Sequence, residues 1–421
     1  MRNLIFISYF FPPMGGGAVL RALKFVKYLP AFGWRPLVVA GAGDYHVRDE
    51  TLVAEIPAAA FVRHVGRGGL FAGAQKAGPP SPPSRHVVAR LSRRLSRQLR
   101  GVASFPDIYS WFARPGYGAA RRLLTSHGGE LIFSTAPPYT SHVVAARLAR
   151  DAGLPLVLDY RDAWAGNPFE RPPTPIHRWR TPRAEAAVLG RASAAVTVTE
   201  GMAEAYRRRL PGGRPVVFIP NGYDEADFAE PAPSREGPFT VAHSGQFYGD
   251  RMPWNFLAAA ARFAARRDLG PDDFVVRFAG PVGRSVLRRA KGFGVRVDAP
   301  GVLGHGDAVR AMRAADVNLI IIGSRPGAAA TLTGKIFEYL RAGRPVLGLV
   351  PPDGEAAALI RQFDAGAVVA PDDVDGAAAA LSRLYDDRGK GARPCPRALR
   401  RFERRRLTAE LAALFDDVVK S

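Results

Sequence analysis

The chain has 421 residues, 47% of them hydrophobic and 23% charged, and it contains a single cysteine, Cys395. This length predicts two or three domains, and the composition is typical of a globular protein rather than a disordered one. One cysteine excludes an intramolecular disulfide and offers no metal-ligand cluster. The sequence contains no run of about 18 uncharged apolar residues, so we expect no transmembrane helix. We therefore expect a cytosolic protein.

The chain is strongly basic, with 59 Lys and Arg against 38 Asp and Glu and a formal net charge of +21. Such a surface attracts nucleic acid, anionic lipid or phosphorylated substrates. The sequence shows no aromatic stacking motif or recognition module, so we expect no specific nucleic-acid binding. The bias toward Arg, Ala, Gly and Pro is also typical of a GC-rich coding sequence. Charge alone therefore does not select a partner.

Short apolar segments alternate with helical patterns in the first half of the chain. Residues 4–8 predict a strand rather than part of a signal peptide, because the loop FFPPMGGG follows them instead of a small-residue cleavage site. A helix is predicted over 18–32 and another over 142–152. Further strands are predicted at 36–40, 131–134, 156–159, 195–199 and 216–219.

The second half repeats this alternation after an acidic, proline-rich segment, 225–238, which predicts a linker. Helices are predicted over 253–265 and 335–341. Strands are predicted at 240–243, 274–279, 317–322, 346–349 and 367–369. Such alternation favours parallel sheets with right-handed crossovers. We therefore predict an α/β protein of two doubly wound, Rossmann-like domains that face one another across a ligand-binding cleft.

A basic amphipathic segment, 85–102, follows a Gly/Pro/Ser-rich loop. Its apolar residues recur at helical spacing, and the rest of it is rich in arginine and has no acid; the apolar residues are Val87, Leu91, Leu95, Leu99 and Val102. Such a helix can lie on an anionic membrane surface. It can equally be a domain helix that packs its leucines on the core. Both interpretations stay open.

The segment 331–354, TLTGKIFEYLRAGRPVLGLVPPDG, predicts one turn of a nucleotide-binding α/β unit. Its helix carries Glu338 near the start and ends at Gly343, and a short apolar strand follows. A carboxylate in this position can accept hydrogen bonds from both hydroxyls of a ribose. The alternative is that Glu338 is a solvated residue paired with Lys335 or Arg341 at helical spacing.

In each half, one glycine-containing loop follows the first strand. Gly15, Gly16 and Gly17 let a ligand approach the backbone at a helix N-terminus, which favours an anion such as phosphate. The spacing matches neither the dinucleotide fingerprint nor the P-loop, and a plain flexible turn is the alternative. In the second half, the loop from Gly245 ends at Arg251, which can clamp a diphosphate or simply be solvated.

Two polar turns of the first half also follow strands. In STAPPYTSH, His142 lies in the first turn of a helix, where the helix dipole disfavours its cationic form and favours a neutral hydrogen-bonding or basic role. A capping histidine without chemistry is the alternative. In DYRDAW, Asp159 and Asp162 flank Arg161 at a strand end, so either a ligand site or an internal ion-pair network is expected.

Several segments occur in an order that resembles a known family. They are ISYFFPPMGGGAVLRALKFVKYLPAFGW, STAPPYTSH, LVLDYRDAW, VTVTEGMAEAY, VVFIPNGYDEADF, AHSGQFY and GKIFEYLRAGRPVLGLVPPDG. Together they resemble the retaining GT-B glycosyltransferases of family 4, especially enzymes of cell-surface polysaccharide synthesis. PNGYD and the KIFEYLRAGRPV segment are the most specific pieces.

The resemblance implies roles for individual residues. Glu338 resembles the second glutamate of the family's E-x7-E motif, which holds the ribose of the sugar nucleotide. Residues implied to bind the sugar nucleotide are Gly16, Gly17, Gly245, Arg251, Lys335 and Glu338. Catalytic roles are implied for His142, Asp162 and Arg251, and acceptor-side roles for Ser134, Tyr139 and Arg161.

The sequence departs from the family pattern at two positions. Ala330 stands where the first glutamate of the motif is expected, and Leu257 lies near the place of a diphosphate-binding lysine. The identity of the sugar, and activity itself, depend on what replaces these groups. A catalytically inactive GT-B binding or scaffold protein is therefore the alternative function, and a nucleic-acid-binding protein is a weaker one.

The function implied by the resemblance is transfer of a sugar from a nucleoside-diphosphate sugar to a hydroxyl of a glycan or lipid-linked acceptor, with retention. We expect no cofactor and no metal, since no Asp-x-Asp signature follows a strand. Domains are predicted at 1–222 and 239–395, with a linker at 223–238 and a C-terminal helix in 396–421 that packs back on the first domain. The predicted location is the cytoplasm, at or near the inner face of the membrane.

Overall fold

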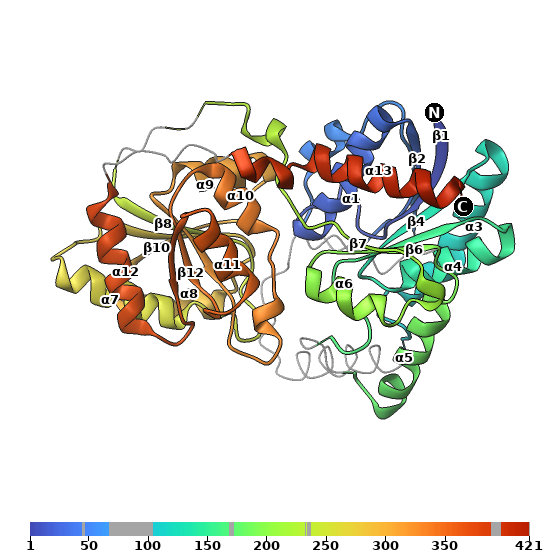
Figure 1. The fold of residues 1–421 in the computed structure, drawn as a ribbon. Helices are drawn as coiled ribbons and strands as arrows, with labels where there is room; N and C mark the ends of the chain where they lie inside the picture. The colour runs from blue at the N-terminus through green and yellow to red at the C-terminus, as the bar shows by residue number, and fades with distance from the viewer. Residues whose placement is uncertain are drawn as a thin grey trace, which may run out of the picture. The chain divides into compact units, whose positions relative to one another are not determined.

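The chain divides into two compact units (Figure 1). The computed structural model describes residues 1–43, 47–66, 104–167, 172–231, 233, 237–388 and 397–420. The first unit comprises Met1–Pro220 with Thr408–Ser421, and the second comprises Asn221–Leu407. The segment expected to be a linker, 223–238, thus belongs to the second unit.

The first unit is built on a seven-stranded parallel sheet in the order β3-β2-β1-β4-β5-β6-β7. The strands are β1 (Arg2–Ile7), β2 (Trp34–Gly41), β3 (Phe61–Val65), β4 (Leu131–Ala136), β5 (Leu156–Tyr160), β6 (Ala194–Thr197) and β7 (Val216–Phe218). The helices are α1 (Gly17–Tyr28), α3 (Ala113–His127), α4 (Thr140–Ala152), α5 (Pro175–Leu189) and α6 (Glu200–Arg207). The central strands are buried and mostly apolar, as strands covered on both faces usually are, but β4 and β5 also bury Ser134, Thr135 and Asp159.

The last helix, α13 (Arg404–Lys420), returns to the first unit for most of its length. The indole of Trp34 donates a 2.9 Å hydrogen bond to Asp416. The ring of Phe415 packs 5.5 Å from the rings of both Trp34 and Phe133. The end of the chain therefore completes the core of the first unit.

The second unit contains a six-stranded parallel sheet in the order β10-β9-β8-β11-β12-β13. The strands are β8 (Phe239–Ser244), β9 (Phe274–Ala279), β10 (Arg296–Gly301), β11 (Val317–Ile321), β12 (Val346–Leu349) and β13 (Gly366–Val369). The helices are α7 (Trp254–Arg266), α8 (Arg284–Ala290), α9 (His305–Ala314), α10 (Lys335–Ala342), α11 (Glu355–Gln362) and α12 (Val374–Asp386).

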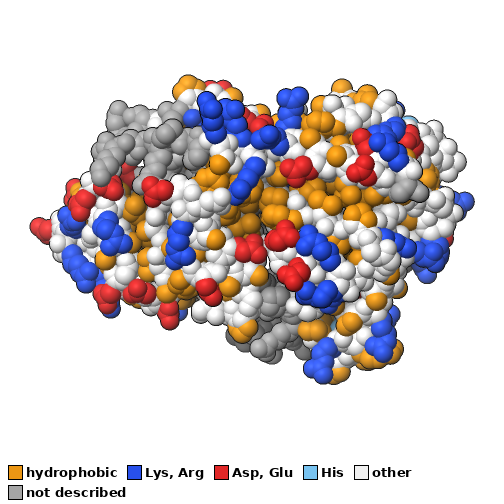
Figure 2. Space-filling view, viewed as in Figure 1, with side chains coloured by type: hydrophobic (Ala, Val, Ile, Leu, Met, Phe, Trp, Pro, Cys, Tyr) orange, Lys and Arg blue, Asp and Glu red, His pale blue; other side chains and the backbone are white. Residues whose placement is uncertain are grey.

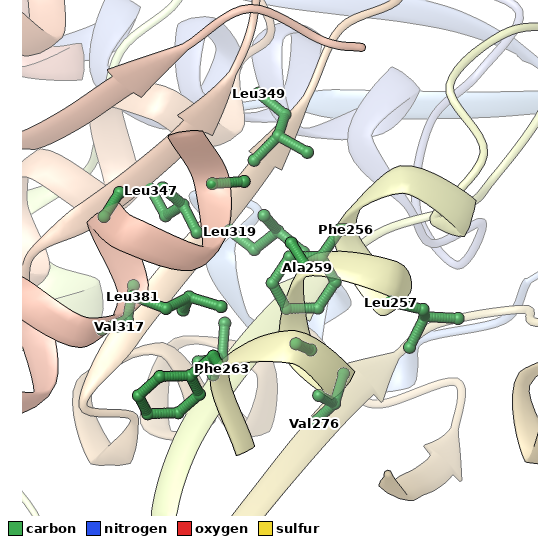
Figure 3. Close-up of a cluster of buried hydrophobic side chains, with 14 of the residues drawn as sticks. Phe256, Leu257, Ala259, Phe263, Val276, Val317, Leu319, Leu347, Leu349 and Leu381 are labelled. Atoms are coloured by element: carbon green, nitrogen blue, oxygen red, sulfur yellow. The ribbon is translucent and has the colours of Figure 1, made fainter. Parts of the chain in front are cut away.

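The sheet of the second unit separates two buried cores. On one face, Phe256 and Phe263 of α7 and Leu381 of α12 pack on strand residues such as Leu319 (Figure 3). On the other face, the next strand residue, Ile320, belongs to the cluster that holds α10. Because strand side chains alternate between faces, both cores form on one set of strands. This packing fixes α10 beside the carboxyl ends of the strands.

The predicted fold class is confirmed, because each unit is a parallel α/β sheet of the doubly wound type. One edge strand of each sheet, β3 in the first unit and β10 in the second, was missing from the prediction. Both are only partly buried and have polar residues among apolar ones. The basic segment 85–102 lies outside the described residues. Within the part of the chain that is described, no helix is long and apolar enough to cross a membrane.

Candidate active site

Both sheets change strand order next to their first strand. In the first unit β1 pairs with β2 and β4, and in the second unit β8 pairs with β9 and β11. Connections that leave such neighbouring strands in opposite directions open a crevice at the carboxyl ends, where doubly wound proteins bind ligands. The predicted site residues lie in the loops at these ends.

The glycine loop after β1 is anchored at one end and open at the other. The N–H of Gly15 donates to Val47 at 2.9 Å, while Gly16 and Gly17 are exposed and would meet no atom within 4 Å if they carried a Cβ. Gly16 has φ 88, a conformation that favours glycine. No described side chain caps α1, and its first turn has no acid. An anion can therefore approach its N–H groups.

Ser134 and His142 form a buried pair below this loop. Their side chains are 0% exposed, and the Ser134 hydroxyl lies 2.8 Å from Nδ1 of His142. Burial lowers the pKa of His142 to about 3, so the ring is neutral at neutral pH. Its Nε2 atom is buried and has no partner among the described residues. In this conformation His142 does not reach solvent, so its proposed catalytic role requires a change in its surroundings and stays a prediction.

Tyr139 and Arg161 hold the acceptor-side loops together rather than projecting freely. Tyr139 stacks on Trp164 at 5.0 Å and donates a 2.7 Å hydrogen bond to the carbonyl of Ala163. Arg161 donates to the carbonyls of Ala18, Ala136 and Pro137. The loops after β1, β4 and β5 are thereby joined.

Asp162, which follows β5, is exposed at the carboxyl end of the first sheet. Because Asp162 directly follows Arg161, the hydrogen bonds of Arg161 also restrict the position of the Asp162 backbone. Asp159, the other acid that flanks Arg161 in the sequence, is completely buried and forms a salt bridge with Arg21.

A buried ion pair that we did not predict lies beneath the first-unit loops. Arg21 of α1 and Asp159 of β5 are 1% and 0% exposed, and they form a 2.7 Å salt bridge. Arg21 also donates to the carbonyls of Ile219 and Pro220, and Thr135 donates to Asp159 at 2.7 Å. Burial opposes ionisation of Asp159, but the Arg21 guanidinium and these hydrogen bonds hold its pKa below the usual value. The pair therefore has a structural role, since it links α1 to β5 and to the segment after β7.

In the second unit, Glu338 lies in the first turn of α10 and is 6% exposed. Lys335 donates to its carboxylate at 3.3 Å. The pairing with Lys335 matches one sequence interpretation, but the burial does not fit a solvated residue. Gly343 ends the helix in the left-handed conformation with φ 70, as the sequence predicted. Glu338 is thus held in one place at the carboxyl edge of the sheet.

The loop after β8 carries Gly245 and Arg251. Gly245 has φ 152, and its carbonyl lies 2.1 Å from where a Cβ on Gly280 would sit, so the two glycines let the loops after β8 and β9 touch. Arg251 donates to the hydroxyl of Tyr248 at 2.7 Å and lies over its ring. Tyr248 is 52% exposed, which leaves this pair at the surface.

His243, at the end of β8, is a candidate residue that sequence reasoning missed. Its Nδ1 lies 2.9 Å from the carbonyl of Leu319, so Nδ1 carries the proton and Nε2 is an acceptor. Burial lowers its pKa to about 4, and Lys335 acts in the same direction. Nε2 is 3.3 Å from the Cβ position of Gly245 and has no partner among the described residues. The available signal was a histidine at the end of a predicted strand, two residues before a glycine.

One more buried hydroxyl in the second unit, that of Thr331, also has no described hydrogen-bond partner. Unsatisfied buried polar atoms are rare in proteins and are often explained by a ligand or water. The second unit thus offers a set of polar groups suited to a hydroxyl-rich anion, namely His243, Thr331, Lys335 and Glu338.

The two departures from the family pattern differ in meaning. Ala330 is exposed at the end of a short 3-10 helix, and its methyl group cannot bond a sugar hydroxyl. Leu257 is 0% exposed in the core of the second unit beside α7 residues such as Phe256 (Figure 3). A lysine there would be a buried charge, so the absence of a lysine at Leu257 says nothing against phosphate binding.

Comparisons with known proteins agree with this geometry. Residues 16–222 match the family model of the glycosyl transferase 4-like domain. Anabaena HepE in complex with UDP-glucose is 18% identical, with a TM-score of 0.65 over 99% of this chain and 100% of that chain. Sucrose-phosphate synthase from Thermosynechococcus elongatus is 19% identical, with a TM-score of 0.63 over 99% of both chains.

WaaG, a glycosyltransferase involved in lipopolysaccharide biosynthesis, is 17% identical, with a TM-score of 0.57 over 98% of this chain and 95% of that chain. No curated protein matches the sequence significantly. These structures share the whole two-unit fold with this chain. They show that the chain has the GT-B fold, and the family model over residues 16–222 adds the class, the GT-B-fold glycosyltransferases.

Within this class, the first unit carries the glycosyl transferase 4-like domain across nearly all of its length. Residues 16–222 thus carry the glycosyl transferase 4-like domain, and the chain is a glycosyltransferase.

Proposed function

We propose that the chain transfers a sugar from a nucleoside-diphosphate sugar to a hydroxyl of a glycan or lipid-linked acceptor, with retained anomeric configuration. The observation that carries the proposal is the fixed, buried Glu338 beside Lys335 at the start of α10. A buried carboxylate can hold the two hydroxyls of a ribose, and the adjacent ammonium suits the diphosphate. HepE, which has this fold, was solved with UDP-glucose and with UDP and glucose.

In this reaction the bond between the anomeric carbon and the diphosphate oxygen breaks, and a bond to the acceptor oxygen forms on the same face of the sugar. The diphosphate leaves with the bonding electrons, and its departing oxygen accepts the proton that the acceptor hydroxyl loses. Lys335, Arg251 and the N–H groups of the glycine loops stabilise the negative charge that develops on the leaving group. His142 and Asp162 are the candidates for contacts to the acceptor and the transferring sugar.

A thermal-shift screen with UDP-, GDP-, ADP- and dTDP-sugars tests the site, because a ligand that binds only the folded chain raises its melting temperature. We expect one nucleotide class to give a shift and Glu338→Ala to abolish it. Asp272→Ala is the matched control, since this carboxylate is 99% exposed in the same unit. A shift that survives Glu338→Ala would contradict the ribose assignment.

An inactive binding or scaffold protein is the second candidate, and Ala330 is the observation that favours it. Such a protein would give a thermal shift with a nucleotide sugar but neither transfer nor hydrolysis of it. Release of the nucleoside diphosphate, measured with the ligand found in the screen, separates the two functions.

We further propose that the protein works in cell-surface polysaccharide or glycoconjugate synthesis, in the cytoplasm and peripherally on the inner face of the membrane. The basic composition supports a membrane-proximal acceptor, because a net charge of +21 attracts anionic lipid. The segment 85–102, our sequence candidate for the membrane contact, lies outside the described residues. Deleting its arginines and measuring sedimentation with acidic liposomes tests this part of the proposal.

A further inference from the structure

Helix α5 of the first unit carries large apolar residues on two opposite sides. Its inner side buries Val188 and Leu189 together with His177 and Glu185. Its outer side exposes Ile176 at 64% and Trp179 at 59%. A surface helix normally shows one apolar stripe, because only one side faces the core. The outer side of α5 therefore presents apolar side chains that do not contribute to the core of the described unit.

The exposed residues of α5 follow one helical face. Ile176, Trp179, Arg180 and Arg183 are spaced three, four and seven residues from the first, which places them side by side along the helix. The Arg183 guanidinium lies 4.2 Å from the centre of the Trp179 ring, and its Nη1 donates to the Trp179 carbonyl at 3.0 Å. The Trp179 ring therefore lies against the helix surface, next to the positive charge of Arg183.

This face is basic and has no acid. The one carboxylate of α5, Glu185, is 2% exposed and accepts hydrogen bonds from Tyr206 at 2.7 Å and Arg209 at 3.1 Å on the inner side. In the space-filling view, basic and hydrophobic side chains gather without acidic ones over the end of the unit where α5 lies (Figure 2).

The surface continues beyond the helix. Arg180 lies 4.3 Å over the ring of Phe105, and Nε2 of His177 lies 3.1 Å from the carbonyl of Ser104. Ile108, three residues after Phe105, is 56% exposed. The stretch 104–108 is thus pinned to α5 and adds a further exposed apolar side chain.

We propose that this α5 face, made of Ile176, Trp179, Arg180 and Arg183, docks on an anionic lipid surface. Tryptophan is enriched at the membrane–water interface, where its ring is apolar and its N–H remains hydrated. Arginine can bury its stem near acyl chains while its guanidinium pairs with lipid phosphate. A protein partner with acidic groups would also complement the arginines, but the absence of any exposed acid on the face favours a surface of uniform negative charge. The inference deepens the proposed function, since it rests on an acceptor that is membrane-proximal.

The test uses the full-length chain and vesicles of phosphatidylcholine alone or mixed with phosphatidylglycerol, with no nucleotide sugar or acceptor present. We expect sedimentation only with phosphatidylglycerol, and at least tenfold weaker partitioning for both Ile176→Ser/Trp179→Ser and Arg180→Ala/Arg183→Ala. The control is Arg207→Ala/Arg208→Ala on α6, which removes the same charge from side chains that are 48% and 67% exposed.

Equal losses in the two arginine double variants would show that net charge alone drives binding, and would overturn the proposal. Unchanged partitioning of both α5 variants would also overturn it. Unaltered melting temperatures exclude misfolding, because all substituted side chains are exposed. Vesicle binding and the nucleotide-sugar thermal shift are measured separately, so failure of one does not disguise failure of the other.

Discussion

At the scale of single residues, the first unit depends on charges that are fully buried. Arg21 and Asp159 are nearly inaccessible, and Arg21 is further tied to the backbone at Ile219 and Pro220. Removing one partner of a buried pair leaves an uncompensated charge, whereas replacing both by apolar groups can be nearly neutral.

We therefore predict that Arg21→Met lowers the free energy of unfolding by about 3–5 kcal/mol. The double variant Arg21→Met/Asp159→Leu should recover a large part of this loss, because no charge remains buried. Urea unfolding followed by circular dichroism measures both. A double variant as unstable as the single one would contradict the account of the pair.

His142 predicts a pH dependence of stability. Its folded pKa of about 3 lies below the value of 6.5 for an exposed histidine, so the unfolded chain binds the proton more readily. The stabilisation is complete above pH 6.5 and is lost as the pH falls toward 3. At one pKa unit per 1.36 kcal/mol, the loss from pH 7.5 to pH 5 is about 2 kcal/mol for this group.

The variant His142→Asn keeps a hydrogen-bonding group near Ser134 but does not titrate in this window. We expect its stability to depend less steeply on pH between 6.5 and 5 than that of the unmodified chain. Parallel slopes, measured as urea midpoints at each pH, would show that His142 is not a buried neutral residue.

At the scale of elements, the two glycines at the ends of β8 and β9 let neighbouring loops approach. Gly280 has φ 150, and a Cβ there would lie 2.1 Å from the carbonyl oxygen of Gly245. We predict that Gly280→Ala shifts the loop that carries Arg251 and weakens nucleotide-sugar binding at least tenfold. Destabilisation of about 1–3 kcal/mol is expected from the strained backbone.

Gly292→Ala is the control for this prediction, since a Cβ at Gly292 meets no atom within 4 Å. Its melting temperature and nucleotide-sugar affinity should stay close to those of the unmodified chain. Equal effects of the two substitutions, measured by thermal unfolding and titration calorimetry, would refute the importance of the close approach.

The elements also show what a sequence can and cannot reveal. Buried strands such as β12 have no polar side chain, and α10 ends at a glycine, so both were predictable. The edge strands β3 and β10 face solvent in part, and their mixed composition gives no clear period. The face of α5 was also missed, because apolar residues on both sides of a helix cancel in its periodicity.

At the scale of the whole molecule, the sequence predicted that the candidate site residues lie near strand ends, but not the burial and hydrogen bonding of their side chains. Glu338 and the glycine loops lie at the carboxyl ends of strands, as the strand-helix alternation implied. That His142 is buried, and that Arg161 is bound to backbone carbonyls, depends on packing between segments far apart in the chain. His243 was overlooked for the same reason, since only the fold brings Lys335 near it.

We also predict that a metal chelator leaves the rate of sugar transfer unchanged. In the proposed site, positive charge of the kind that a divalent cation provides in other transferases would come from Lys335, Arg251 and backbone N–H groups. The comparison is the rate of nucleoside diphosphate release with EDTA and with added Mg²⁺ or Mn²⁺. A rate that falls with EDTA and returns with metal would contradict it.

The central claim is that the chain transfers a sugar from a nucleotide with retention. The most direct measurement is proton NMR of the anomeric signal while the full-length chain turns over the nucleotide sugar found in the thermal-shift screen. We predict that the first product formed has the anomeric configuration of the nucleotide sugar and that Glu338→Ala forms none. A first product of the opposite configuration, or no turnover with a nucleotide sugar that binds, would contradict it.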